Sequence, residues 1–343
     1  MDNLTHTLFA LTLARTSLGR AGRGTTPALV IASNAPDVDI VTTAGGALSY
    51  LRWHRGPTHG PLGVIGLGLL TAVIVWMGRR LLDRPPHSVS RWIDVARGKL
   101  PPRAGAPPDA GRASFAMLVA VSMVGVLLHI LMDLPTSYGT RIFSPFDWHW
   151  YSTDWMPIVD VYLLIALATG LAFGRGSDVA RRRNAAIVFV FMAANYGVRA
   201  AEHYQALNLA PRLFGPLLPR SCDSAPPRAP LLAKWPRNEA ANASSSRGAS
   251  EEAVRARPDQ ASTRCLIEIA AMPNFTSPFE WRVIAHLSNA YELHDVAVLD
   301  SRFSDPESDR NAFWRVSLRY PNQWTEPVFK AARTRIGETF AHF

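Results

Sequence analysis

The sequence predicts a mainly α-helical membrane protein: a helical bundle with about four spanning helices and short N-terminal helices, followed by a small α+β extramembrane domain. Long apolar runs fill residues 1–205, whereas residues 206–343 are polar, rich in Pro, Arg and Ser, and contain no such run. Arginines gather beside the apolar runs. The mean hydropathy of +0.03 is that of a soluble protein only because it averages these two unlike parts.

Two short apolar segments come first, at Leu4–Leu13 and Pro27–Ala35. A span needs about 20 apolar residues and at least about 17, so these two predict half-spanning or packed helices. Longer runs follow that contain no Asp, Glu, Lys or Arg except one aspartate: Pro61–Met77, Ser114–Met132, Pro157–Phe173 and Asn184–Val198. The first two are the clearest candidates for spans. The alternative for such runs is a buried core helix of a soluble all-α protein.

The distribution of basic residues predicts which side each loop faces. A net charge of +9 with a pI of about 10 is also typical of nucleic-acid-binding proteins. Here, however, the arginines lie mainly in loops 79–112 and 174–183 and in the turn between the two short N-terminal segments. Loops rich in Arg and Lys stay in the cytoplasm. We therefore expect no nucleic-acid partner and a multi-pass protein of a bacterial inner membrane, in contact with lipids. Residues 206–343 would face the periplasm.

The polar C-terminal region predicts a linker and a small domain. Residues 206–262 carry many Pro, Ala, Ser and Arg residues, which predicts a partly disordered linker between the membrane domain 1–205 and the domain 263–343. The loop 83–113 is similar and is predicted to be irregular. Short β-branched or aromatic segments predict four strands, and a helix follows: Cys265–Ile269, Trp281–His286, Val296–Leu299, Trp314–Tyr320 and Glu326–Phe340.

Two cysteines, Cys222 and Cys265, lie in this C-terminal region. An oxidising compartment outside the cytoplasm permits a bridge between them. A pair of cysteines is equally compatible with two free thiols, so the sequence leaves both states open.

Histidines and aspartates gather at the ends of the apolar segments. Imidazole and carboxylate are common protein ligands of zinc and similar metals. The predicted topology places these segment ends on one face of the membrane, as a single metal site requires. The residues are His6, Asp37, Asp39, His54, His59, His129, Asp133, Asp147 and Asp160.

Two of these clusters lie in segments that must turn. Gly-Pro separates His54 from His59 and cannot continue a regular helix, so the turn can aim both imidazoles at one point, with Arg55 available for an anion such as phosphate. The alternative is a loop with two solvated histidines. Asp37 and Asp39 alternate, and in an extended stretch both would point to the same side. Their alternative is an ordinary Pro-Asp turn that ends a helix.

The other clusters lie on predicted helices. His129 and Asp133 are four residues apart on an apolar helix and therefore share a face. An ionisable pair in a spanning helix is costly and indicates function, although a His–Asp hydrogen bond that only ties helices together is the alternative. His6 follows Asp2 and Thr5, either of which can cap a helix start.

In these residues the chain resembles a known family, the membrane-bound metal-dependent hydrolases that are also described as LexA-binding inner-membrane-associated hydrolases. The resemblance covers residues 1 to about 175 and rests on blocks that occur in the same order: Asp2–His6, Ala35–Asp39, His54–His59, His129–Asp133, Pro135–Gly139, Pro145-Phe146 and Asp160. The family is distantly similar to the all-helical zinc phospholipase C and P1-type nucleases, which implies a multi-metal phosphoesterase-like site.

By this resemblance the metal ligands are His6, Asp37, Asp39, His54, His59, His129, Asp133 and Asp160. In the soluble relatives the amine of the processed N-terminus is also a ligand. This sequence shows no signal for processing that would expose such an amine, so the number of metal ions stays open.

The function predicted from the sequence is hydrolysis of a phosphoester or a lipid-linked substrate through a water activated by one or more divalent metal ions, zinc foremost. Arg55 would steady the phosphate, and Asp37 or Asp133 would accept the proton of the water. The alternative is a structural metal site or polar network in a regulatory or partner-binding membrane protein. An open coordination position distinguishes the two. A transporter would need polar residues deep within the spans, whereas here they gather at the span ends.

Overall fold

The computed structural model describes residues 1–82, 111–173, 177–214, 219–222, 265–299, 318–321 and 325–341. The chain divides into two compact units. The first unit holds residues 1–134, 140–151 and 164–190, and the second unit holds residues 135–139, 152–163 and 191–343. The predicted irregular loop over 83–110, the linker over 223–262 and the predicted strand residues 314–317 lie outside the described residues.

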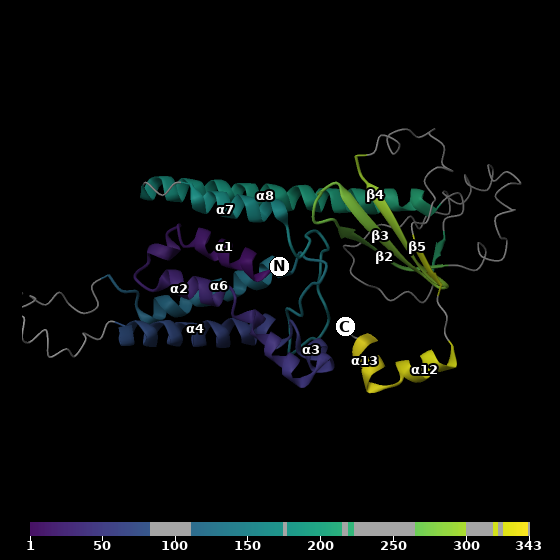
Figure 1. Ribbon diagram of the computed structural model, residues 1–343, viewed down its shortest axis with the longest axis horizontal. Coiled ribbons are helices and arrows are strands. Elements are labelled where there is room, and N and C mark those ends of the chain that lie inside the picture. Colours follow the sequence, from purple (N-terminus) through teal and green to yellow (C-terminus); the bar gives the residue numbers. More distant parts are fainter. Residues whose placement is uncertain are drawn as a thin grey trace, which may run out of the picture. The chain divides into compact units, whose positions relative to one another are not determined.

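The first unit is built from helices that pack side by side (Figure 1). Its longer helices are α1 (Asn3–Leu13), α2 (Thr25–Ala32), α4 (Pro61–Leu82) and α6 (Phe115–Asp133). Shorter ones connect them: η1 (Leu18–Arg20), η2 (Pro36–Gly45), α3 (Ala47–Trp53) and η3 (Pro57–His59). A Cβ atom on Gly125 would lie 2.8 Å from the Cβ of Ala32, so small residues allow α2 and α6 to approach closely.

Side-chain caps and prolines fix where these helices begin. Asp2 caps α1 by accepting a hydrogen bond of 3.0 Å from the backbone N–H of Thr5, and Ser114 caps α6 in the same way. Pro36 and Pro57 occupy the first positions of η2 and η3, where a missing N–H costs nothing. The helix ends that carry the predicted metal ligands are therefore set by local sequence.

Within the described residues three helices are long and apolar enough to cross a membrane: Pro61–Leu81, Phe115–Asp133 and Asp178–Leu209. The predicted fold class is thus confirmed, and the last span belongs to α8 (Asp178–Leu209), which is longer than the predicted run. The segment Pro157–Phe173 forms only the 12-residue helix α7 (Val161–Ala172). Asp160 caps it by accepting from the N–H of Leu163 at 2.7 Å, so helix begins only after this aspartate.

The second unit contains a five-stranded sheet in the order β1-β2-β3-β4-β5. Strand β1 pairs with β2 in parallel and the remaining pairs are antiparallel. The predicted C-terminal helix is divided into two helices at Arg333 and Thr334. The bounds are β1 Arg220–Ser221, β2 Cys265–Pro273, β3 Glu280–Leu287, β4 Ala290–Ala297, β5 Leu318–Pro321, α12 Glu326–Ala332 and α13 Arg335–Ala341.

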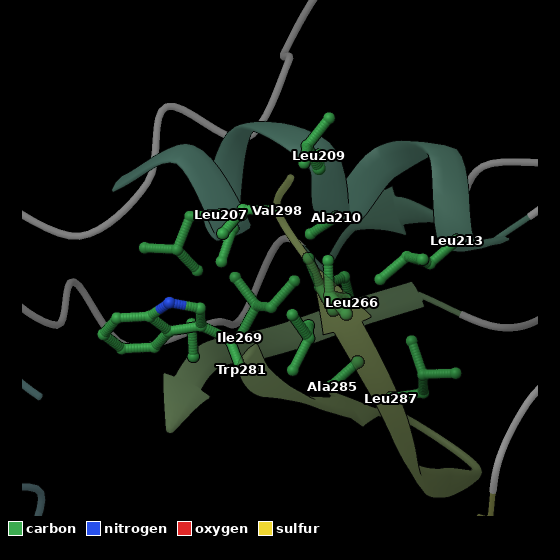
Figure 2. Packing of buried hydrophobic residues seen from close by; sticks show 14 residues of the cluster. Leu207, Leu209, Ala210, Leu213, Leu266, Ile269, Trp281, Ala285, Leu287 and Val298 are labelled. Atoms are coloured by element: carbon green, nitrogen blue, oxygen red, sulfur yellow. The ribbon is translucent and has the colours of Figure 1, made fainter. Parts of the chain in front are cut away.

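One face of this sheet is covered by the end of α8 and by η4 (Ala210–Phe214) (Figure 2). Leu207, Leu209 and Leu213 pack there with Trp281 of β3, whose side chain is almost fully buried. The boundary expected at residue 205 falls inside α8 because these apolar residues continue the helix onto the sheet. Cys222 and Cys265 form a disulfide bond, which decides between the two states that the sequence left open.

Replacing Trp281 by alanine is expected to destabilise the sheet by about 3–5 kcal/mol, because the change removes a large buried side chain and leaves a cavity. Trp281 is 2% exposed, and its Nε1–H donates to the carbonyl of Pro278 at 3.0 Å. Resistance of the C-terminal region of the full-length protein to proteolysis over a urea series measures the effect. Tyr320→Ala is the control, since Tyr320 is 54% exposed. Equal resistance of both variants would contradict the packing described.

Candidate metal centre

Four potential metal ligands meet at one point of the first unit. They come from three elements: Asp37 from η2, His59 from η3, and His129 with Asp133 from α6. One donor atom of each lies within 4.8 Å of the others. Both histidines and Asp133 are buried, whereas the side chain of Asp37 is 18% exposed. Asp37 is therefore the one of the four that solvent reaches.

The spacing of the four donor atoms fits a small divalent ion. The two imidazole Nε2 atoms are 3.3 Å apart. Nε2 of His59 lies 3.7 Å from Oδ1 of Asp37 and 3.5 Å from Oδ2 of Asp133. Nε2 of His129 lies 3.5 Å and 3.4 Å from the same two oxygens. Ligands held tetrahedrally at about 2.0–2.1 Å from an ion lie about 3.3 Å from one another. The cluster is therefore able to hold a metal ion.

Contacts on the far side of each imidazole are the basis on which we assign its proton. Nδ1 of His129 lies 2.7 Å from the carbonyl oxygen of Ser33, which can only accept, so we assign the proton to Nδ1. Nδ1 of His59 lies 3.0 Å from Oγ1 of Thr58, whose hydroxyl donates to Asp39. Both Nε2 atoms then present lone pairs to each other, an arrangement that favours a cation between them.

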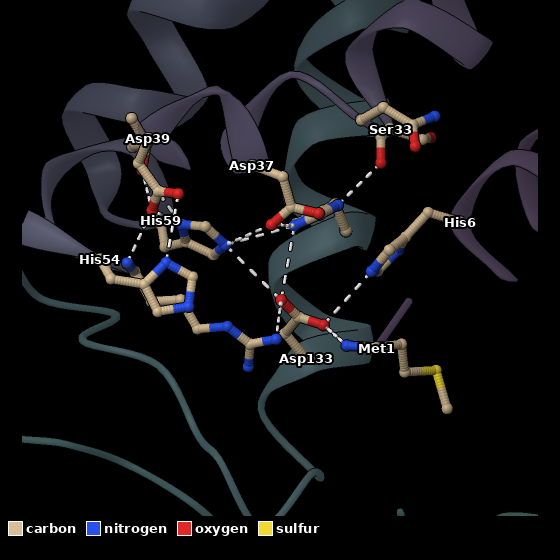
Figure 3. A network of polar contacts seen from close by, with 12 residues as sticks. Met1, His6, Ser33, Asp37, Asp39, His54, His59 and Asp133 are labelled. Carbon is tan, nitrogen blue, oxygen red and sulfur yellow. Dashed lines mark hydrogen bonds and ion pairs between the residues drawn. The ribbon is translucent and has the colours of Figure 1, made fainter. Parts of the chain in front are cut away.

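Asp39 lies beside the cluster and contacts His59, which is a member of it, and the backbone of Arg55 (Figure 3). Its carboxylate accepts from the backbone N–H of Arg55 at 2.7 Å and lies 3.2 Å from Nδ1 of His54 and 3.7 Å from Nδ1 of His59. The extended stretch predicted over Asp37 and Asp39 is wrong, because both belong to the 3₁₀-helix η2. Residues two apart on such a helix point in different directions. The structure thus groups Asp39 and His54 with each other, outside the set of four donors.

Asp133 is the most heavily contacted member of the cluster. Its Oδ1 lies 3.2 Å from Nε2 of His6 and accepts from the α-amino group of Met1 (Figure 3). Its Oδ2, which faces the two imidazoles, is also 3.2 Å from Nη2 of Arg55. His6 therefore meets the cluster through the second oxygen of Asp133. The sequence could not predict the contact between the amino group of Met1 and Asp133, because that group belongs to the main chain and not to a particular side chain.

Arg55 is held in an unusual backbone conformation beside Asp133. Its φ angle is +50°, in a region that residues other than glycine rarely adopt and that often marks functional sites. The N–H of Arg55 binds Asp39 and its carbonyl accepts from the N–H of Arg141 at 3.1 Å. These two bonds hold the conformation, and the side chain is buried.

The electrostatic environment of His59 and Asp37 favours the protonation states that can bind a metal. Burial lowers the pKa of His59 to about 4, so its imidazole stays neutral near pH 7. Burial alone would raise the pKa of Asp37, but the imidazoles of His129 and His59 beside it outweigh this and hold the pKa well below its usual range. Neutral imidazole and ionised carboxylate are the states that bind metals.

Two predicted aspartates have other partners. Asp160 belongs to the second unit, where its carboxylate pairs with Nε of Arg199 at 2.7 Å and lies 3.3 Å from the amide nitrogen of Asn195. Asp147 accepts from the hydroxyl of Tyr151 at 2.6 Å and contacts His149. The carboxylate of Asp160, a metal ligand by the family resemblance, is thus paired with an arginine in this structure.

Comparison with known proteins shows the family to which this chain belongs. Residues 1–206 match the YdjM inner membrane protein family. The chain belongs to that family. The match includes every residue of the four-donor cluster, and it confirms the family resemblance seen in the sequence. The distant similarity to zinc phospholipase C and P1-type nucleases stays a prediction.

A curated relative is an uncharacterized protein, YfhP, of Bacillus subtilis (strain 168), which is 23% identical over 180 residues. The matched region covers 50% of this chain and 46% of the relative, so the chain spans about half the length of that protein. No solved structure matches the chain.

Replacing His129 by alanine is expected to remove bound metal, because it deletes one of the four donors, the imidazole that the carbonyl of Ser33 orients. The matched control is His149→Ala, since the side chain of His149 is 86% exposed and contacts Asp147 instead. Elemental analysis of each protein purified in detergent gives the metal content per chain. Equal metal in the two variants would show that the ion, if present, is held elsewhere.

Proposed function

We propose that this protein is a membrane-bound metal-dependent hydrolase that cleaves a phosphoester of a lipid or lipid-linked molecule, with zinc as the first candidate metal. The observation that carries the proposal is the pair of buried imidazole Nε2 atoms 3.3 Å apart, with two carboxylates beside them. Such a donor set binds zinc and other borderline divalent ions. Solvent reaches this site at Asp37, so a substrate can approach it there.

The residues of the chain divide the catalytic tasks. His59, His129, Asp37 and Asp133 would hold the ion, which when bound supplies a water of lowered pKa and polarises a phosphoryl oxygen. Asp37 is the better candidate to accept a proton from that water, because Asp133 is fully buried and already contacts Arg55 and His6. The guanidinium of Arg55, which contacts Asp133, has five N–H donors and is the candidate to bind a phosphate oxygen.

A lipid or lipid-linked substrate is supported by the apolar surface around this edge. Val38, Ile40 and Val41 of η2 are exposed although they flank Asp37 of the cluster and Asp39 beside it. Trp53 and Trp148 are also exposed and pack edge to face, with ring centroids 5.7 Å apart. Trp residues concentrate at membrane interfaces. An acyl chain can lie against such a surface while its phosphoester reaches the cluster.

The proposed orientation places the cluster on the periplasmic side of a multi-pass protein. Helix α6 starts after Arg112 and ends at Asp133, and α4 starts after His59 and ends with Arg79 and Arg80. A helix of 19 residues is about 28 Å long, close to the hydrocarbon thickness of a bilayer. Arginines thus mark one surface and the cluster the other. The disulfide bond in the C-terminal region supports an oxidising compartment there.

One observation favours the alternative of a structural metal centre in a regulatory or partner-binding membrane protein. Four protein donors fill a tetrahedral site, whereas a catalytic zinc keeps a position for water. The hydrolase therefore requires a fifth position at the exposed side of Asp37. Hydrolysis and metal content, measured together, separate the two functions.

The activity test compares hydrolysis of phosphoester and lipid substrates by wild type, His59→Ala and His149→Ala in detergent. We expect His59→Ala to lose both metal and hydrolysis, because it deletes a donor, and His149→Ala to keep both. Arg55→Ala should keep the metal and lose roughly one to two powers of ten in kcat/KM, since a charge-assisted hydrogen bond contributes about 1.5–3 kcal/mol. Stoichiometric metal without any hydrolysis in wild type would favour the structural centre.

The orientation test uses single cysteines at two exposed positions, His149→Cys near the cluster and Val179→Cys near the start of α8. The native cysteines are bonded to each other. An impermeant thiol reagent added to intact spheroplasts should label the cysteine at 149 and leave the one at 179 unlabelled until the cells are lysed. Labelling at 179 alone would reverse the orientation.

A further inference from the structure

A second charged site lies in the first unit at the other end of α1 from His6. A cavity of about 260 Å³ opens where the end of α1, the turn after it and the start of α8 meet. Four arginines from segments far apart in the sequence line it together with one aspartate: Arg15, Arg20, Arg181, Arg182 and Asp178. The sequence placed both segments on the cytoplasmic side, and the structure brings them to one cavity.

The lining carries an excess of three positive charges, because Asp178 is the one acidic residue among the described residues that line it. The carboxylate of Asp178 pairs with Arg181 and lies 3.9 Å from Nη1 of Arg20. One carboxylate cannot neutralise four guanidinium groups. The cavity therefore favours an anion with more than one acceptor oxygen, which guanidinium groups bind in forked geometry.

Arg15 is fixed in place by the end of α7. Its Nη1 donates to the carbonyl of Gly170 at 2.8 Å and its Nη2 to that of Leu171 at 2.6 Å. These carbonyls are neutral, so they orient the guanidinium without cancelling its charge. Arg15 is thus held in one orientation, whereas the side chains of the other three arginines are exposed.

Apolar atoms line the same cavity beside the arginines. Leu11 and Ala14 at the end of α1 face it. A small hydrated anion gains nothing from such a wall, whereas a phospholipid can place its phosphate on the arginines and its glycerol and first methylenes on the apolar side. Basic pockets between helices on the cytoplasmic side of a membrane recognise lipid head groups in this way.

We propose that this cavity binds the phosphate group of an anionic phospholipid of the cytoplasmic leaflet. The site is separate from the metal centre and does not depend on any hydrolytic activity. Its role is to hold α1, α7 and α8 together at the membrane surface with a lipid as part of the contact.

The test measures binding of phosphatidylglycerol and phosphatidylcholine to the full-length protein, delipidated in detergent, by native mass spectrometry. Wild type should bind phosphatidylglycerol in preference to phosphatidylcholine. Arg182→Gln should weaken phosphatidylglycerol binding about five-fold, and Arg20→Gln/Arg182→Gln about 25-fold, since each arginine near a membrane surface contributes about 1 kcal/mol. Arg183→Gln is the matched control, because it removes the same charge from the next residue, which does not line the cavity.

Arg182→Lys keeps the charge without the forked geometry, so it should bind more tightly than Arg182→Gln and less tightly than wild type. This recovery would show that the loss in Arg182→Gln is not a folding defect. Soluble glycerol 3-phosphate, added as competitor, separates a lipid from a free phosphate compound and should displace phosphatidylglycerol only at far higher concentration. Equal weakening by Arg182→Gln and Arg183→Gln would overturn the proposal, as would displacement by glycerol 3-phosphate at a concentration equal to that of the lipid.

Discussion

Two buried imidazole nitrogens that face each other at 3.3 Å are the constraint on which the site depends. Ser33 and Thr58 hold the protons on the opposite sides of the two rings, so that neither ring donates a hydrogen bond to the other. Without a cation the two facing lone pairs of this arrangement repel each other. The rest of the first unit, from the caps of α1 and α6 to the strained backbone of Arg55, holds these groups in that position.

The sequence predicted much of this arrangement, and the reasons differ from residue to residue. The spacing of His129 and Asp133 on an apolar helix placed both on one face, and a helix geometry of 3.6 residues per turn leaves little choice. His54 and Asp39 were expected as ligands because a turn and an extended stretch were expected to aim them inward. The structure forms η2 there, so Asp39 turns toward the backbone of Arg55 and binds His54 instead.

The sequence could not predict contacts made by main-chain groups, because every residue type carries them. The carbonyl of Ser33 and the amino group of Met1 belong to the backbone, yet each contacts a member of the cluster. The pairing of Asp160 with Arg199 joins residues far apart in the chain, and only the packing of α8 reveals it. The same limit explains the four arginines of the cavity, which the charge pattern placed on one side of the membrane but not beside one another.

X-ray absorption spectroscopy of the purified full-length protein, at the edge of whichever metal it carries, tests the central claim most directly. The account predicts one ion bound by nitrogen and oxygen donors at about 2.0–2.1 Å, with the multiple scattering of two imidazoles per ion. A protein without stoichiometric metal, or an ion bound by sulfur or by no imidazole, would contradict it.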